Sequence, residues 1–314
     1  MARAFVFPGQ GSQYIGMGQM LANSFPEARE VFQEVDDTLS QKLSQIMFEG
    51  PQGDLNMTEN TQPALMAVSM AVVRVLEKQG GFALADKCTY MAGHSLGEYS
   101  ALSAAGVLGI ADTAKLLKIR GVEMQKAVPV GVGSMAAILG MEMEAVAKIA
   151  AEAAGDQICE AANDNSDGQI VVSGHKEAVE RAVALASEQG AKRAVVLPVS
   201  APFHCALMEP AAKAMAEALG EVEFIKPSVP VVANVTAQGE SDPAVLKALL
   251  VDQITGKVRW RESVLWMRDS GVSELAELGA GKVLSGLTRR IDREVKSQSI
   301  ETPEQVEAFL EGLS

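Results

Sequence analysis

The first third of the chain alternates short apolar runs with longer segments of helical periodicity. Ala4–Phe7 is apolar and is followed by Pro8–Gln13, whose glycines and polar side chains predict a loop at the end of a buried strand. The next expected elements are helices over 61–80, 99–105 and 112–126, with Asp112 as N-cap of the last, and a buried strand over 88–92. Strands that alternate with helices predict a parallel sheet covered on both faces.

The pattern changes between residues 131 and 198. This segment follows the order βαββαβ, with strands expected over 134–139, 157–162, 169–173 and 193–197 and helices over 142–154 and 176–189. That order is typical of a ferredoxin-like unit, so we predict a ferredoxin-like subdomain at 131–198, inserted into an α/β domain made of 1–130 and 199–314. The α/β domain should resume with helices over 207–219 and 243–255 and strands over 229–234 and 272–278, and should end in a polar surface helix after Asp292.

Composition and charge narrow the class of protein. Hydrophobic residues make up 48% of the 314 positions, enough for a substantial core. The 27 basic and 40 acidic side chains give a net charge of −13, whose field repels phosphates, so neither a nucleic-acid nor a membrane partner is expected. The 3 cysteines form no CxxC pair, which argues against a disulfide framework or a thiolate metal site. This use of cysteine fits a reducing, cytoplasmic setting, and no apolar stretch is long enough for a signal or a membrane span. We also expect a monomer.

The segment 93–97, with the sequence GHSLG, matches the GxSxG pattern of a nucleophile elbow. It lies between a predicted buried strand and a predicted helix, which is the context that the elbow requires. Its glycines permit the tight turn, and the turn places the Ser95 hydroxyl at a helix N-terminus, where the dipole favours negative charge. A turn that merely caps the helix is the alternative, and the context favours a nucleophile.

A serine nucleophile needs a general base, and the chain contains 3 histidines. His94 adjoins Ser95, and neighbouring side chains point in different directions, so we expect it to support the turn. His175 begins a helix of the predicted insert, where a surface or capping role is simpler. His204 follows a strand in an irregular segment, where ligand sites of α/β sheets gather. Elimination leaves His204 as the base. The alternative is that His204 is a buried structural histidine whose hydrogen bonds are all made within the core.

No aspartate makes a convincing third member of a triad, because the candidates lie in or beside polar loops or helix starts and can each be a solvated carboxylate: Asp164, Asp167, Asp242 and Asp252. A Ser–His dyad is therefore predicted, with a backbone or amide carbonyl orienting the imidazole. The oxyanion formed during acyl transfer needs N–H donors. Leu96, directly after the nucleophile, is the first expected donor, and the loop at 9–11 is the natural source of the second unless it is a plain turn.

Arg120 lies on the apolar face of the predicted helix 112–126. At about 100° per residue it shares that face with Thr113, Leu117 and Met124, whereas the lysines of the helix point elsewhere. Burying an arginine without a partner is costly, so it should hold a carboxylate. Spacing alone leaves open whether that carboxylate belongs to the protein or to a substrate. Residues 131–136 fit a loose dinucleotide pattern, but their glycines precede a strand instead of following one, so we expect a hinge there and no dinucleotide site. No metal site is predicted either.

Six motifs together resemble the malonyl-CoA:acyl carrier protein transacylases, the acyltransferases of type II fatty acid synthesis. In the family's order and approximate spacing, they are FPGQGSQ (7–13), GHSLGEY (93–99), Arg120, NDNSDGQ (163–169), Pro202–His204 and GAGKVL (279–284). The similarity extends from Phe7 to about Arg290 and implies an α/β-hydrolase-like core with a parallel sheet plus an inserted ferredoxin-like small domain. Asp164, where an apolar or aromatic residue is common, and Ala280, where proline is common, are small departures.

The resemblance implies a role for each matching residue. Ser95 would be acylated, with His204 as general base and then acid, and Arg120 would bind the free carboxylate of the malonyl group. The amides of Gln10 and Leu96 would form the oxyanion hole.

Four further residues are implied around the substrate. Asn165 and Gln253 resemble the family's polar residues beside the dyad, where the carbonyl of Gln253 would orient His204. His94 would also lie among the substrate-binding residues. The bulk of Phe203 would disfavour branched acyl groups.

The implied reaction is a ping-pong transfer of malonyl from malonyl-CoA to holo acyl carrier protein, in which coenzyme A enters as a substrate thioester and no cofactor is needed. An esterase or thioesterase using the same elbow is the alternative among enzymes, but a hydrolase of neutral esters has no use for Arg120. A catalytically silent acyl-binding subunit is a different class, and the intact Ser95 and His204 pair counts against it.

Overall fold

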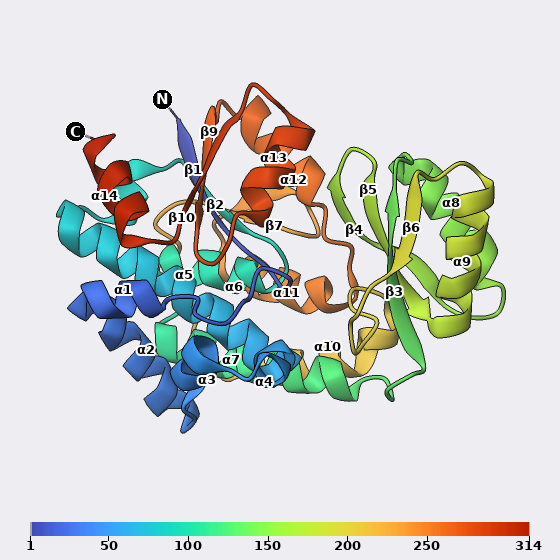
Figure 1. Cartoon of the computed structure of the whole chain (residues 1–314), viewed down its shortest axis with the longest axis horizontal. Helices are drawn as coiled ribbons and strands as arrows, with labels where there is room; N and C mark the ends of the chain where they lie inside the picture. Colours follow the sequence, from blue (N-terminus) through green and yellow to red (C-terminus); the bar gives the residue numbers. More distant parts are fainter. Residues whose placement is uncertain (1, 314) are drawn as a thin grey trace.

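A six-stranded sheet forms the centre of the larger part of the molecule (Figure 1). The computed structural model describes residues 2–313. The strands lie in the order β10-β9-β1-β2-β7-β8, and only β8 runs antiparallel to its neighbour. Their bounds are β1 (Arg3–Phe7), β2 (Tyr90–Gly93), β7 (Val231–Ala233), β8 (Gln238–Glu240), β9 (Glu274–Leu278) and β10 (Lys296–Ile300). The predicted parallel α/β core is confirmed.

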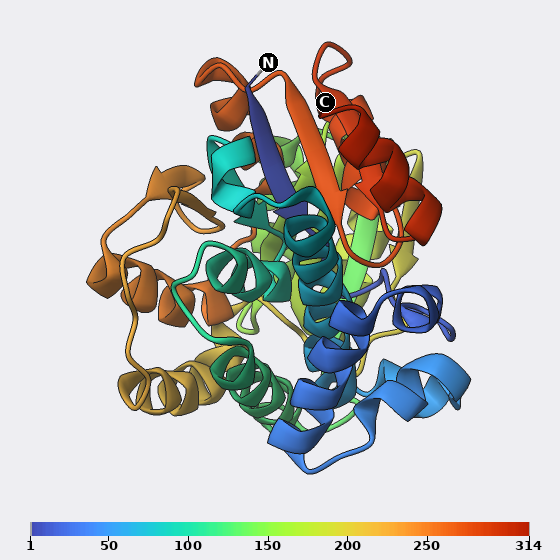
Figure 2. The ribbon, with the colours of Figure 1, turned by 90° about the vertical axis from the view of Figure 1, so that its left-hand side faces the viewer.

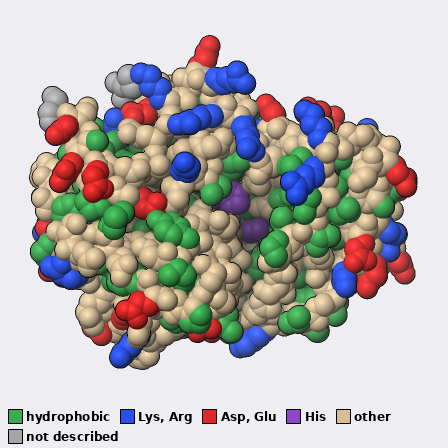
Figure 3. All heavy atoms as spheres, viewed as in Figure 1, with side chains coloured by type: hydrophobic (Ala, Val, Ile, Leu, Met, Phe, Trp, Pro, Cys, Tyr) green, Lys and Arg blue, Asp and Glu red, His purple; other side chains and the backbone are tan. Residues whose placement is uncertain are grey.

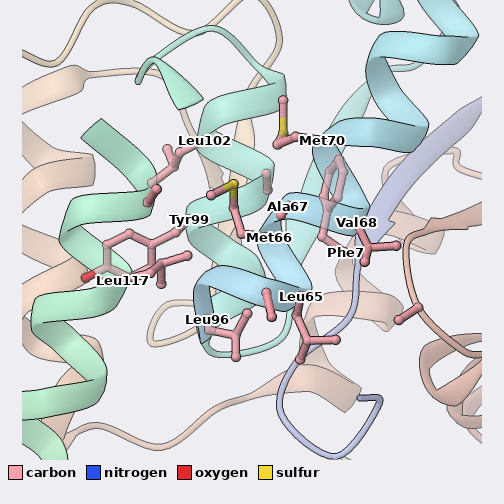
Figure 4. Close-up of a cluster of buried hydrophobic side chains, with 14 of the residues drawn as sticks. Phe7, Leu65, Met66, Ala67, Val68, Met70, Leu96, Tyr99, Leu102 and Leu117 are labelled. Carbon is pink, nitrogen blue, oxygen red and sulfur yellow. The ribbon is translucent and has the colours of Figure 1, made fainter. Parts of the chain in front are cut away.

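Helices cover both faces of this sheet, because the alternating side chains of its strands are apolar on both sides. The first face carries α1 (Gln19–Ser24), α2 (Pro26–Leu39), α3 (Leu43–Glu49), α4 (Gln52–Asn56), α5 (Thr58–Gly80), α6 (Leu96–Ala104), α7 (Ile110–Lys126), α10 (Glu209–Gly220), α11 (Pro243–Thr255) and α14 (Pro303–Glu311). The second carries α12 (Trp260–Asp269) and α13 (Val283–Ile291). Phe5 and Phe7 of β1 pack into a large cluster with α5, α6 and α7, part of which Figure 4 shows, while Ala4 and Val6 pack against α12 and α13. Figure 2 shows α5 running along the first face.

A second, four-stranded antiparallel sheet lies beside the core (Figure 1). Its order is β4-β5-β3-β6, formed by β3 (Gly133–Leu139), β4 (Cys159–Ser166), β5 (Gln169–His175) and β6 (Arg193–Val196), with α8 (Met143–Ala154) and α9 (Lys176–Glu188) packed on one face. The predicted βαββαβ order is therefore confirmed. The other face presents Met135 and Val171 to the core. Asp164 N–H donates to Val258 O at 2.9 Å and Val258 N–H to Ala162 O at 2.9 Å, which joins β4 to the segment before α12.

Some element boundaries differ from the predictions. The N-cap of α7 is Gly109, so Asp112 lies within the first turn and is not the cap. Helix α5 begins at Thr58 and therefore contains Pro63 in its interior. The polar tail forms a strand, β10, before its final helix α14, because an edge strand needs few apolar side chains.

Over residues 2–313, none of the helices combines the length and the apolar character needed to cross a membrane. The three cysteines are free thiols. The same part of the chain contains no group of three or more His, Cys, Asp or Glu side chains arranged to hold a metal ion.

Candidate active site

Ser95 occupies a sharp turn between β2 and α6. Its backbone has φ 53° and ψ −111°, a conformation that L-residues rarely adopt and that tends to occur at functional sites. The flanking glycines are required by close approach: a Cβ on Gly93 would lie 1.9 Å from the backbone of Gly97, and a Cβ on Gly97 would lie 2.3 Å from Phe7 O. The sequence thus forces Ser95 to the carboxyl end of the sheet and to the N-terminus of α6.

The Ser95 hydroxyl meets His204. Ser95 Oγ lies 2.7 Å from His204 Nε2, and on the other side of the ring His204 Nδ1–H donates to the backbone carbonyl of Gln253 at 2.9 Å. A carbonyl orients the imidazole, as the dyad hypothesis expects, and it fixes the tautomer in which Nε2 is free to accept a proton. His175 is elsewhere, at the N-cap of α9, where its Nδ1 accepts from Ile158 N–H at 3.0 Å.

His204 is held as a neutral imidazole. Its side chain is buried, and burial together with the positive charge of Arg120 lowers the pKa of His204 to about 3. Its backbone φ of 59° is a second unusual conformation in the same site. A neutral, oriented imidazole beside a serine hydroxyl is suited to general-base chemistry.

Arg120 is 1% exposed, and the hydrogen bonds of its guanidinium go to neutral groups. Its guanidinium donates to Gln62 Oε1 at 2.8 Å, to Gln253 Oε1 at 2.8 Å and to Ser95 Oγ at 3.1 Å. Across the described residues it takes part in no salt bridge, and its Nε lacks a hydrogen-bond partner. The internal ion pair that spacing had left open is therefore absent from this part of the chain, and the guanidinium retains capacity for a carboxylate beside the serine.

Asn165 reaches the site from β4. Its Oδ1 lies 2.8 Å from His94 Nε2, and the His94 ring packs 5.8 Å from that of Trp260. Burial lowers the pKa of His94, so it is neutral and can donate to Asn165. His94 thus ties the elbow to the smaller sheet.

Asp164 is not a solvated carboxylate, which was one possibility for it in the sequence. Its side chain is 1% exposed and forms a salt bridge at 3.0 Å with Arg261 of α12. Register shifts in β4 on both sides of Asp164 place Asn163 and Asn165 on the cavity and Asp164 toward α12. Asp167 contacts the same guanidinium at 3.4 Å and is mostly exposed.

A cavity of about 180 Å³ opens above the dyad, between the core and the smaller sheet. Figure 3 shows histidine side chains at the bottom of this hollow. The polar lining comprises Gln10, Gln62, His94, Ser95, Arg120, Asn163, Asn165 and His204, and the apolar lining Met124, Met135, Val171, Leu197, Val199 and Phe203. The cavity thus suits a small acyl group with a polar end.

The two predicted oxyanion donors come from different segments of the chain. Leu96 is the first residue of α6, where a backbone N–H has no intrahelical acceptor. Gln10 follows the end of β1 and lines the same cavity.

Three residues of the site were missed by sequence reasoning: Gln62, Glu98 and Asn234. Asn234 Oδ1 accepts from Ser95 N–H at 2.7 Å, and Glu98 accepts from the Gln253 amide at 2.7 Å. A polar residue at the end of a buried strand was a usable signal for Asn234. Glu98 and Gln62 lay inside helical patterns and gave no such signal.

The chain is similar to known proteins in both sequence and structure. The family described as "Acyl transferase domain" matches residues 4–302. The malonyl CoA-acyl carrier protein transacylase of Escherichia coli K12 is 48% identical over 308 residues, covering 98% of each chain. The crystal structure of the acyl-carrier-protein S-malonyltransferase of Bartonella henselae is 56% identical with a TM-score of 0.98, covering 100% of this chain and 99% of that one. A malonyl-transacylase solved in complex with its type II PKS acyl-carrier protein is 44% identical with a TM-score of 0.96, covering 99% and 100%.

Proposed function

This chain belongs to the acyl transferase family, among the malonyl-CoA:acyl carrier protein transacylases, and we propose that it transfers the malonyl group from malonyl-CoA to the phosphopantetheine thiol of holo acyl carrier protein. The product would supply fatty acid chain elongation. The carrier protein bound to a similar enzyme supports this choice of acceptor.

The first half-reaction acylates Ser95. His204 Nε2 takes the hydroxyl proton as Ser95 Oγ adds to the thioester carbonyl, and the N–H groups of Gln10 and Leu96 stabilise the oxyanion. The carbon–sulfur bond then breaks, and the coenzyme A thiolate leaves with the proton from His204. A malonyl ester of Ser95 remains.

The second half-reaction reverses these roles with a new thiol. The phosphopantetheine thiol gives its proton to His204 and adds to the ester carbonyl, and Ser95 Oγ leaves with that proton. The nucleophile, the base and the carboxylate site are all side chains of the chain itself, so the proposed reaction calls on no cofactor. Coenzyme A thioesters and carrier proteins of this pathway meet in the cytoplasm, which is the proposed location.

The observation that carries the proposal is Arg120, which is buried, has no salt-bridge partner among residues 2–313 and donates to Ser95 Oγ at 3.1 Å. Malonyl carries a carboxylate one methylene away from its thioester carbonyl, so a carbonyl at Ser95 Oγ brings the carboxylate to the guanidinium. Burial and the positive charge of Arg120 together lower the pKa of His204, and a carboxylate bound at Arg120 would offset the second of these causes and strengthen the base.

The experiment must separate transfer from hydrolysis. The protein is mixed with malonyl-CoA with and without holo acyl carrier protein, and malonyl-carrier and free malonate are both quantified. We expect malonyl-carrier to form in large excess over malonate, and to depend on Ser95. Release of malonate at a similar rate with or without the carrier would identify a thioesterase, and no turnover in either case would identify a silent acyl-binding subunit.

A further inference from the structure

Glu98 is a buried acid directly behind the nucleophile, and the reaction above does not use it. It lies in the first turn of α6 with 0% of its surface exposed. One oxygen, Oε2, accepts two hydrogen bonds, from Asn234 N–H at 3.0 Å and from Gln253 Nε2 at 2.7 Å. Within residues 2–313 the other oxygen, Oε1, has no partner. A buried carboxyl is costly, so its retention beside the nucleophile calls for a purpose.

Both partners of Glu98 hold the backbone of Ser95. Asn234 Oδ1 accepts from Ser95 N–H at 2.7 Å, and Gln253 Nε2 donates to Ser95 O at 3.1 Å. Asn234 Nδ2 also donates to Gly93 O at 2.7 Å. The peptide groups on both sides of Ser95 are therefore tied to side chains that Glu98 itself anchors. Such ties stabilise the unusual φ of 53° at Ser95.

Glu98 also decides which way the Gln253 amide faces. An amide has a donor end and an acceptor end, and a carboxylate oxygen only accepts. With its NH₂ group on Glu98, Gln253 must turn Oε1 toward Arg120, which donates to it at 2.8 Å. The backbone carbonyl of the same Gln253 orients His204. A single acceptor atom, Glu98 Oε2, thus helps to position both Ser95 and Arg120. It does so partly through Gln253, the residue whose backbone carbonyl also orients His204.

We propose that Glu98 is a positioning residue for acylation, whose Oε2 fixes Ser95 and Gln253 in the reactive arrangement through the location of its hydrogen-bond acceptor. This inference rests on the proposed function, since it concerns the rate at which Ser95 is acylated. The role does not require a charge, because an uncharged carbonyl oxygen at the position of Oε2 accepts the same two hydrogen bonds. Burial raises the pKa of Glu98 to about 7, against the opposing effects of these hydrogen bonds and of the Arg120 charge.

Two matched variants separate acceptor position from charge. Glu98→Gln keeps a carbonyl oxygen at the position of Oε2 but removes the charge, whereas Glu98→Asp keeps the charge but withdraws the oxygens by one methylene. Acylation of Ser95 by malonyl-CoA is followed by rapid quench and intact mass, with thermal unfolding as a check on folding. We expect Glu98→Gln to retain the wild-type rate within about threefold and Glu98→Asp to lose about 100-fold, the effect of misplacing a reacting group by about 1 Å.

The acyl group provides a further readout. Because Glu98 positions the nucleophile and not the carboxylate site alone, Glu98→Asp should slow malonyl and acetyl transfer alike. Asn234 links Glu98 to the backbone of Ser95, and Asn234→Ala removes the acceptor for Ser95 N–H. This variant should also slow acylation, so it provides the test if Glu98→Asp does not fold. A wild-type acylation rate in Glu98→Asp, or in Asn234→Ala where that variant replaces it, would overturn the inference. Slower acylation of Glu98→Gln than of Glu98→Asp would also overturn it. Failure of the wild type itself to be acylated would instead overturn the proposed function.

Discussion

Replacing Arg120 by alanine should remove the preference for an acyl group that carries a carboxylate, while leaving Ser95 and His204 able to react. The prediction follows from the position of the guanidinium, which donates to Ser95 Oγ at 3.1 Å and is otherwise held by the neutral amides of Gln62 and Gln253. A neutral acyl group makes no use of this charge.

The size of the effect follows from the burial of the site. Arg120 is 1% exposed, so a bound carboxylate is shielded from water there. A hydrogen bond to a charged group contributes about 1.5–3 kcal/mol, and about 1.4 kcal/mol corresponds to a tenfold change in rate. We therefore expect kcat/KM for malonyl-CoA to fall by about 10- to 150-fold, and kcat/KM for acetyl-CoA to change by less than about threefold, in Arg120→Ala.

The assay measures kcat/KM for both thioesters with holo acyl carrier protein as the common acceptor. Lys118→Ala is the matched control, because it removes a cation from the same helix that contacts Glu59 at 3.2 Å instead of lining the cavity. That variant should keep the wild-type ratio of malonyl to acetyl transfer. Equal losses for malonyl and acetyl in Arg120→Ala, or an unchanged ratio, would refute the assignment of Arg120 to the carboxylate.

The remaining predictions concern pH and stability. Burial and Arg120 lower the pKa of His204 in the free enzyme to about 3. The value of kcat/KM for acylation, which reports the free enzyme, should therefore stay constant as the pH falls from about 8 to 5; a loss with a midpoint near the ordinary value of 6.5 would contradict this. The unfolded chain protonates this histidine at about 6.5, so its contribution to the free energy of unfolding should be complete above that pH and decline as the pH falls toward 3, which urea titrations at several pH values measure. Asp164→Asn should lower the free energy of unfolding by about 2 kcal/mol, between the effects of buried and surface pairs. Asp167→Asn, at a side chain that is 59% exposed, should change it by less than about 0.5 kcal/mol.

Much of the smaller sheet was predictable from sequence because several of its elements show a regular spacing of buried residues. Val146 and Ile149 mark the buried face of α8, and Ile138 and Ile170 mark buried positions of β3 and β5, so these elements can be recognised from the local sequence. Strand β10 was not predictable, because in Lys296–Ile300 only Ile300 is buried. Its pairing with β9 supplies the stability that the local sequence lacks.

The same distinction applies to the residues of the site: some can be identified from the local sequence, and others depend on contacts between segments that are distant in the chain. Ser95, His204 and Arg120 could each be predicted from the sequence. A turn motif identifies Ser95, elimination among three histidines identifies His204, and a helical face identifies Arg120. Gln253 came only from family resemblance, since the atom that meets His204 is a backbone carbonyl. The burial of Asp164 could not be predicted because it depends on register shifts in β4 and on Arg261, which is distant in the chain.

The central claim is that Ser95 carries the malonyl group between two thiols. Intact-mass measurement after mixing the protein with malonyl-CoA alone tests it most directly. The account predicts one malonyl group per chain, located on Ser95 by peptide mapping, absent in Ser95→Ala, and transferred to holo acyl carrier protein when that is added. An unmodified wild-type chain, or an adduct that persists in Ser95→Ala, would contradict it.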